Sequence, residues 1–207
     1  MAPANVKLSN AELLLVCDEQ FILTKNVIIE KVYQLFGALS QQFSNIQKNN
    51  TAVFPAAALT ISPKIYKGEQ YKGMPYVLLD CPRLFIKDDA FAIRCFFWWG
   101  NFFSITLHVA GKYAAIYAPP VLQALQQNKN GQWHICVNEN QWEHHFNADN
   151  YLPVDKDLLA ALNKQGVSQK GFIKIAKKIP LKQWDDANEF FVNTYQEIIE
   201  MLSTPKS

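Results

Sequence analysis

The chain lacks the features that mark secreted and membrane proteins. Residues 1–7 have no apolar core behind a positive start, so we expect no signal peptide. The longest apolar stretches fall far short of the ~20 residues that a membrane helix needs. The four cysteines, at positions 17, 81, 95 and 136, are widely spaced and form no C-x-x-C pair. They therefore predict reduced thiols in a cytoplasmic protein with no membrane contact.

The chain also has little charge. Charged residues make up 18% of the 207 residues, and 20 Lys and Arg against 18 Asp and Glu leave a net charge of +2. Nucleic-acid binding usually needs a clustered basic surface, so we expect no nucleic-acid partner. The hydrophobic content is 49% and aromatic residues reach 13%. Such a composition favours one domain over residues 1–207, with loose ends, and some apolar surface covered by a ligand or a second subunit.

No catalytic or phosphate-binding signature is present. Gly68 and Gly73 have the glycine spacing of a P-loop, but Met74 and Pro75 follow where that loop needs Lys and Ser or Thr. The patterns G-x-G-x-x-G, G-x-S-x-G and H-E-x-x-H do not occur. The sequence therefore gives no reason to expect a cofactor or a metal, and it assigns no catalytic residue.

Helical patterns lie mainly at the two ends of the chain. Ser9 and Glu12 form a capping box that predicts a short helix through Val16. Apolar residues at three- and four-residue steps predict longer helices over 25–47 and 181–202. Shorter helices are expected over 155–164 and from Pro119 onward.

Alternating patterns in the middle of the chain predict strands over the ranges 58–62, 76–86, 91–99, 102–109, 133–137 and 172–179. Residues 64–75 have the composition of turns. Pro82 predicts an edge or a bulge in its strand, and Lys174 and Lys178 suit an exposed edge. The fold class that follows is α+β: a single domain with a mainly antiparallel sheet of about five or six strands, backed by N- and C-terminal amphipathic helices.

An aromatic hairpin over residues 91–109 is the strongest β signal. If Gly100 and Asn101 form a two-residue turn, Trp99 pairs with Phe102. One face then carries Ala92, Arg94, Phe96, Trp98, Phe103, Ile105, Leu107 and Val109, and we expect helices to cover it. The other face carries Ile93, Cys95, Phe97, Trp99, Phe102, Ser104, Thr106 and His108. Arg94 on the covered face needs a partner such as Asp80 or Glu30, a place at the rim or an anionic ligand.

The mixed second face is the first functional hypothesis. It predicts a noncatalytic domain that binds a small, anionic ligand or a protein. The residues expected to take part are Trp99, Phe102, Thr106, His108, His134, Arg83 and Lys67.

Two alternatives stay open. A hydrolytic or metal-assisted enzyme would use His134, Cys136, Glu143 and His144, although their spacing is not that of a known zinc motif. A homodimer would bury Trp98 or Trp99 at the tip of the hairpin, where rings occur on both faces. The tip could equally be buried by other elements of the same chain.

Overall fold

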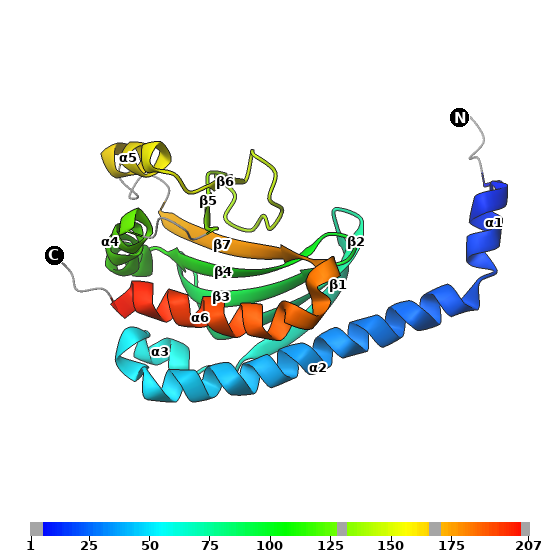
Figure 1. The fold of residues 1–207 in the computed structure, drawn as a ribbon, viewed down its shortest axis with the longest axis horizontal. Coiled ribbons are helices and arrows are strands. Elements are labelled where there is room, and N and C mark those ends of the chain that lie inside the picture. Colours follow the sequence, from blue (N-terminus) through cyan, green and yellow to red (C-terminus); the bar gives the residue numbers. More distant parts are fainter. Residues whose placement is uncertain (1–5, 128–131, 166–170, 204–207) are drawn as a thin grey trace.

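The computed structural model describes residues 6–127, 132–165 and 171–203 (Figure 1). The helices are α1 (Asn10–Val16), α2 (Glu19–Asn49), α3 (Ala56–Leu59), α4 (Lys112–Gln127), α5 (Lys156–Gln165) and α6 (Ala187–Ser203), with 3₁₀ turns at Thr51–Val53 and Leu181–Asp186. The strands are β1 (Lys64–Tyr71), β2 (Met74–Ile86), β3 (Asp89–Trp98), β4 (Phe102–Ala110), β5 (His134–Cys136), β6 (Tyr151–Pro153) and β7 (Phe172–Pro180). The expected loose ends lie outside the described residues.

All seven strands join one antiparallel sheet in the order β1-β2-β3-β4-β7-β5-β6. The α+β class and the antiparallel sheet are confirmed, with seven strands rather than five or six. Two strands were missed. Strand β1 lies in the segment that reads as turns, and β6 is only three residues long.

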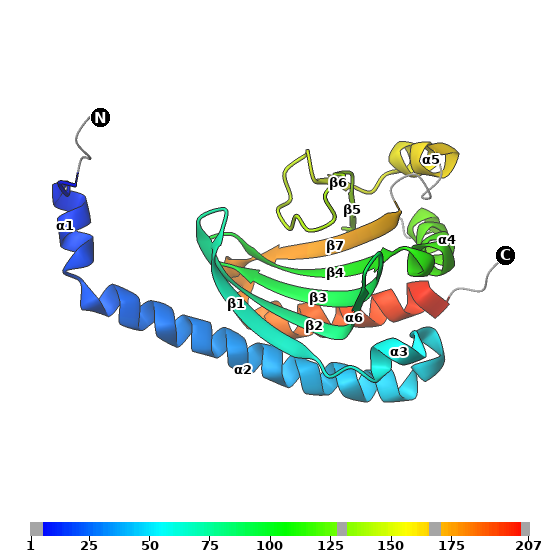
Figure 2. The same cartoon turned by 180° about the vertical axis from the view of Figure 1, so that it is seen from behind.

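Helices α2, α4 and α6 cover one face of the sheet, as the two views of the ribbon show (Figures 1 and 2). Strands β2, β3, β4 and β7 supply apolar side chains to this core, among them Phe97, Phe103 and Ile175. Phe36 and Phe43 of α2 and Tyr195 of α6 meet them there, all fully buried. Phe43 stacks on Tyr195 with ring centroids 3.9 Å apart. This face is the main core of the molecule.

The hairpin register differs from the expected one by one residue. Trp98, not Trp99, pairs with Phe102, so the loop has three residues, and Gly100 adopts a φ of +72°. The backbone N–H of Asn101 donates to the carbonyl of Trp98 across this loop, at 3.0 Å. Every β3 side chain therefore lies on the face opposite to the one expected. Arg94, Phe96 and Trp98 join Phe102, Ser104, Thr106 and His108 on the second face, while Ile93, Cys95 and Phe97 enter the helix-covered core.

Three further expectations are wrong, and the expectation of an edge or a bulge at Pro82 is met by a bulge. The segment expected as a strand over 58–62 begins inside helix α3 (Ala56–Leu59), which follows Pro55 and is built from three alanines and a leucine, and it contains no strand. Strand β2 is internal, because β1 pairs outside it, but the expected bulge is present as a register shift between Asp80 and Arg83. Strand β7 is also internal, and Lys174 on it is 2% exposed. Finally, α4 begins at Lys112 and contains Pro119 and Pro120 in its interior.

Among the described residues, no helix combines the length and the apolar character that crossing a lipid bilayer requires.

The packing of the helix-covered core can be tested by removing one of its rings. Phe103 is fully buried and contacts the rings of Phe97, Trp184 and Phe191 at centroid distances of 5.4, 5.2 and 5.8 Å. We expect Phe103→Ala to lower the free energy of unfolding by about 3–5 kcal/mol, because it leaves a cavity in the core. Ile116→Ala, at a side chain 40% exposed, should cost less than about 1 kcal/mol in the same urea titration. Equal losses would contradict this packing.

Candidate functional site

The second face of the sheet contains a buried ion pair. Asp80 on β2 and Arg94 on β3 are 3% and 7% exposed, and they pair directly across the strands. The guanidinium donates twice to the carboxylate, from Nε to Oδ1 at 2.6 Å and from Nη2 to Oδ2 at 2.9 Å. The hydroxyl of Tyr66 donates to Oδ2 at 3.3 Å. Asp80 was one of the two partners expected for Arg94, and this internal bidentate pair provides the charge compensation that burial requires.

Residues 137–150, between β5 and β6, form a loop that covers much of this second face; we call it the covering loop. The Tyr71 hydroxyl anchors it, accepting from the backbone N–H groups of His144 and His145 at 2.7 and 3.0 Å and donating to Glu143 Oε2 at 2.9 Å. The ring of His144 packs on that of Phe96 at 5.0 Å. A loop therefore covers the second face of the sheet, whereas helices cover the face of the main core.

Lys174 holds the covering loop from the side of β7. Its ammonium donates to the carbonyl oxygens of Gln141, at 2.9 Å, and Glu143. Burial lowers the pKa of Lys174 to about 8, because the charged amine has lost most of its water. The amine is thus occupied by the protein's own backbone.

Three of the predicted ligand-binding residues lie beneath this loop. Phe102, Thr106 and His108 share the second face, as expected, and are 8%, 5% and 2% exposed. Phe146 of the covering loop packs edge-on against Phe102 at 5.1 Å, and Gln141 hydrogen-bonds His108 Nε2 at 2.7 Å. A ligand could reach these side chains only after displacing the loop.

The other four predicted residues lie apart from them. Trp99 packs against the helix-covered core, next to Phe97. His134 contacts Phe146 from β5, Arg83 donates to the carbonyl of Ser62 at 2.9 Å, and Lys67 is exposed on β1. The structure therefore does not gather the seven residues into one site. Binding of a small ligand at the second face stays a prediction.

The hairpin tip is covered on both sides by the same chain. Trp98 is 8% exposed, and its indole N–H donates to the carbonyl of Tyr71 at 3.2 Å. Trp99 is half-buried on the opposite face. Of the interpretations given to the tip, burial by the chain's own elements fits this packing, and neither indole presents a wide contact surface to a second copy.

The residues of the enzyme alternative have separate partners. The Cys136 thiol contacts the side-chain oxygen of Asn150 at 3.5 Å, and Glu143 accepts from Tyr71. Burial lowers the pKa values of His134 and His144, which favours their neutral forms. Within the described part of the chain, no three His, Cys, Asp or Glu side chains lie close enough together to hold a metal ion. The metal-assisted alternative therefore has no ligand set there.

A different feature, the N-terminal arm, stands out by its exposure. We use this name for residues 6–27, which include α1 and the first part of α2. Ten of the 14 exposed large apolar side chains of the described chain belong to it, each 44–85% exposed: Val6, Leu8, Leu13, Leu14, Leu15, Val16, Phe21, Ile22, Leu23 and Val27. The first buried residue of α2 is Ile29, and α1 has none. The arm therefore leaves the body of the molecule with its apolar side chains in water.

The arm is apolar on all sides, which a helix packed on one surface is not. Successive helical residues are about 100° apart, so the four residues Leu13–Val16 point in four directions around α1. In α2, Phe21 and Ile22 continue the side that faces the sheet, while Leu23 and Val27 face away from it. A helix that is apolar all round is normally buried.

Local interactions nevertheless build the arm as two defined helices. Ser9 and Glu12 make the expected capping box, with Glu12 Oε2 accepting from the Ser9 N–H at 2.7 Å. The Asp18 carboxylate caps α2 by accepting from the Phe21 N–H at 3.2 Å. Between them the chain bends, and α1 turns toward the side of α2 on which the sheet lies (Figures 1 and 2). The arm therefore has the shape of a hook.

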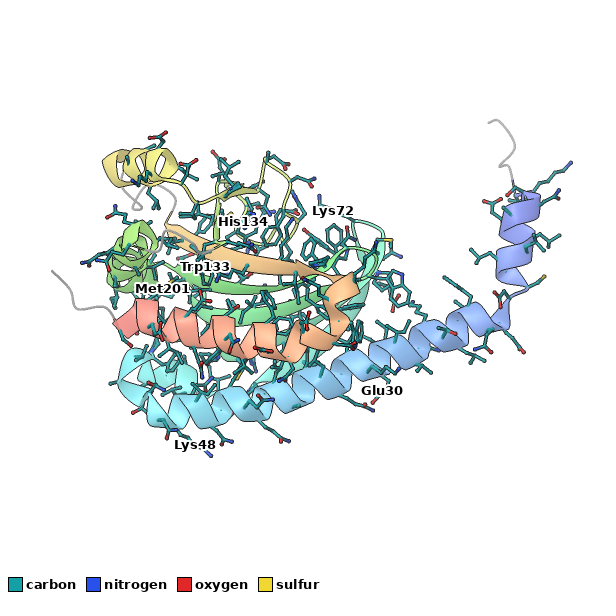
Figure 3. The ribbon with its side chains drawn as sticks, viewed as in Figure 1. Glu30, Lys48, Lys72, Trp133, His134 and Met201 are labelled. Atoms are coloured by element: carbon teal, nitrogen blue, oxygen red, sulfur yellow. The ribbon has the colours of Figure 1, made fainter. Side chains whose placement is uncertain are left out.

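A cleft of about 450 Å³ lies where the arm joins the body. It is lined by Lys25, Asn26, Ile29, Glu30 and Tyr33 of α2 and by Lys67 and Glu69 of β1. Figure 3 labels Glu30 near the point where α2 leaves the body. Lys25 forms an ion pair with Glu69 across the cleft. Lys67, one of the predicted site residues, thus lies at the base of the arm.

Sequence reasoning found α1 but missed the exposure of the arm. A usable signal was present: Leu13–Val16 is a run of four apolar residues directly after a capping box, too long for the one-sided stripe of a surface helix. Comparison of the chain with protein-family models, curated proteins and solved structures finds no match.

The ion pair on the second face leads to a stability test. We expect Asp80→Ala to lower the free energy of unfolding by about 3–5 kcal/mol, because it leaves the Arg94 guanidinium buried without a counter-charge. The double variant Asp80→Leu/Arg94→Met removes both charges and should lie closer to the wild type. Urea unfolding of the three chains measures this. If the double variant is less stable than Asp80→Ala, the ion pair stabilises the fold by more than the cost of burying its two charges.

The buried histidine leads to a pH test. Burial lowers the pKa of His108 from its ordinary 6.5 to about 3, so between these values the unfolded chain binds a proton that the folded chain does not. Stability must therefore fall on acidification through this window. From pH 6.5 to 5.5 the loss due to His108 alone should be about 1 kcal/mol. In paired urea titrations the free energy of unfolding of the wild type should fall by about 1 kcal/mol more than that of His108→Gln. Equal falls in the two proteins would contradict the lowered pKa of His108.

Proposed function

We propose that this protein is a noncatalytic protein-interaction domain and that the N-terminal arm is its recognition element. The observation that carries the proposal is the exposure of ten large apolar side chains on residues 6–27, eight of which lie around two well-capped helices. Large exposed apolar surfaces mark interaction sites. A partner would bury the arm between two surfaces rather than bind it along one.

The size of the arm suits a specific interface. Its ten side chains expose on the order of 1,000 Å² of apolar surface, and each partner in a standard protein interface buries about 800 Å². Because capping fixes both helices before binding, less conformational entropy is lost on association than for a disordered segment.

The charges of the arm favour a protein over a membrane or a nucleic acid. The arm carries Lys7 and Lys25 against Glu12, Asp18 and Glu19. Helices that lie on membranes combine one apolar face with a polar face rich in Lys and Arg, and nucleic acids need a basic surface. The arm has neither, so a protein partner fits its composition best.

A cytoplasmic location belongs to the same proposal. The four cysteines are all free thiols: Cys17 is exposed at the bend of the arm, and Cys81, Cys95 and Cys136 are buried. A reducing compartment would keep the exposed thiol from forming a disulfide beside the recognition surface.

Photocrosslinking in living cells tests the arm directly. The photoreactive residue p-benzoyl-phenylalanine would replace Leu14 or Leu23 on the arm and, as the matched control, the exposed Ile116 on α4. We expect irradiation to give discrete protein adducts from positions 14 and 23 and none, or far weaker ones, from position 116. Mass spectrometry of each band then identifies the partner.

The contrary outcome is equally clear. If positions 14 and 23 give no more adduct than position 116, the arm contacts no protein and the proposal fails. Sedimentation with vesicles of phosphatidylcholine and phosphatidylserine provides the membrane comparison. Binding to vesicles that Leu14→Asp abolishes, without protein adducts, would reassign the arm to a lipid surface.

A further inference from the structure

The sheet-facing side of α2 follows one repeat through the body and out along the arm. Inside the body the buried residues recur at alternating steps of three and four, at positions 29, 32, 36, 39 and 43. The same steps carried backward reach Lys25, Ile22 and Asp18. This is the seam of a coiled coil, which buries its residues against a facing helix. From Ile29 onward the chain's own sheet and α6 cover the seam. Before Ile29 the seam runs out from the sheet: Lys25 still pairs with Glu69 of β1, and Ile22 is 51% exposed.

The uncovered part of the seam is complementary to itself. Two copies of α2 that cross antiparallel, with a two-fold axis between positions 21 and 22, place Phe21 of each copy opposite Ile22 of the other. The same register places Asp18 of each copy opposite Lys25 of the other. A two-fold contact of this kind uses one patch on both subunits. Four apolar side chains would form its centre, and an ion pair would close it on each side.

We propose that the occupant of the arm is a second copy of this chain, bound through antiparallel crossing of the two α2 helices at Phe21 and Ile22. This inference rests on the proposed function, for which it names the partner. Opposite charges facing each other at both ends fix the register and disfavour the parallel arrangement, which would bring like residues together.

A charge-swap experiment with two full-length variants tests the register. Asp18→Lys alone faces Lys25 of its copy with a like charge, and Lys25→Glu alone faces Asp18 in the same way. An equimolar mixture restores both opposite-charge pairs in a heterodimer. By sedimentation equilibrium we expect the wild type to dimerise, each variant alone to self-associate at least about tenfold more weakly, and the mixture to return to within about threefold of the wild type.

Three control variants and one disruptive variant keep the test specific. Asp18→Asn removes the charge but keeps a side chain that can cap α2. It therefore separates the effect of the charge from the effect of the cap. Glu69→Gln removes the internal partner of Lys25 and should leave the dimer intact. Lys31→Glu reverses an exposed charge outside the seam, and mixing it with Asp18→Lys should not restore the dimerisation that Asp18→Lys loses. Ile22→Asp should give a folded monomer by circular dichroism and sedimentation.

The outcomes separate this inference from the proposed function. A wild type that stays monomeric at about 100 μM, or a dimer unaffected by Ile22→Asp and by the charge reversals, overturns the second copy as occupant. If the adducts at positions 14 and 23 then contain another protein, the proposed interaction role is supported and only the identity of the partner changes. Crosslinks at the mass of two 23.7-kDa chains support both proposals, and no crosslinks at all overturn both.

Discussion

Helix α2 is longer than the sheet face that it covers, and the rest of the structure has to accommodate this difference in length. Its 31 residues span about 46 Å, but burial begins only at Ile29. From there to Phe43 the helix packs on β1 and β2 and against α6, which brings Phe43 onto Tyr195 and completes the core. The preceding turns continue the same seam beyond the sheet, where Lys25 still pairs with Glu69 of β1 and Ile22 is exposed. One continuous repeat therefore serves both the core and the arm.

The body that supports the arm is closed on both faces of the sheet. Helices cover one face, and the covering loop, tied down by Tyr71 and Lys174, covers the other. The charged groups found between the loop and the sheet have partners within the chain, since Arg94 pairs with Asp80 and the Lys174 ammonium binds backbone carbonyls. A closed body with internally compensated charges acts as a rigid support for a recognition element outside it.

Much of this fold can be read from the sequence, because strong local signals agree with the tertiary packing. The capping box at Ser9, the helical repeat through Phe36 and the strand pattern from Phe91 predicted their elements, and the need to compensate Arg94 pointed to Asp80. The failures have specific causes. A single extra residue in the loop at Gly100 reverses the faces of β3, and no local rule chooses between a two- and a three-residue loop there. Strand β1 has a glycine and several charged residues, so only its pairing with β2 reveals it.

The candidate site was harder to predict than the fold, because exposure is a property of the whole chain. The sequence shows that Phe21 and Ile22 belong to an apolar stripe, but only the structure shows that the sheet ends before it reaches them. Hydrogen exchange of the amides of residues 10–28, followed against protein concentration, tests the central claim most directly. Pairing of two arms predicts that protection in this segment rises with concentration while that of β3 and β4 does not change. Equal, low protection of the arm from dilute to concentrated solution would contradict it.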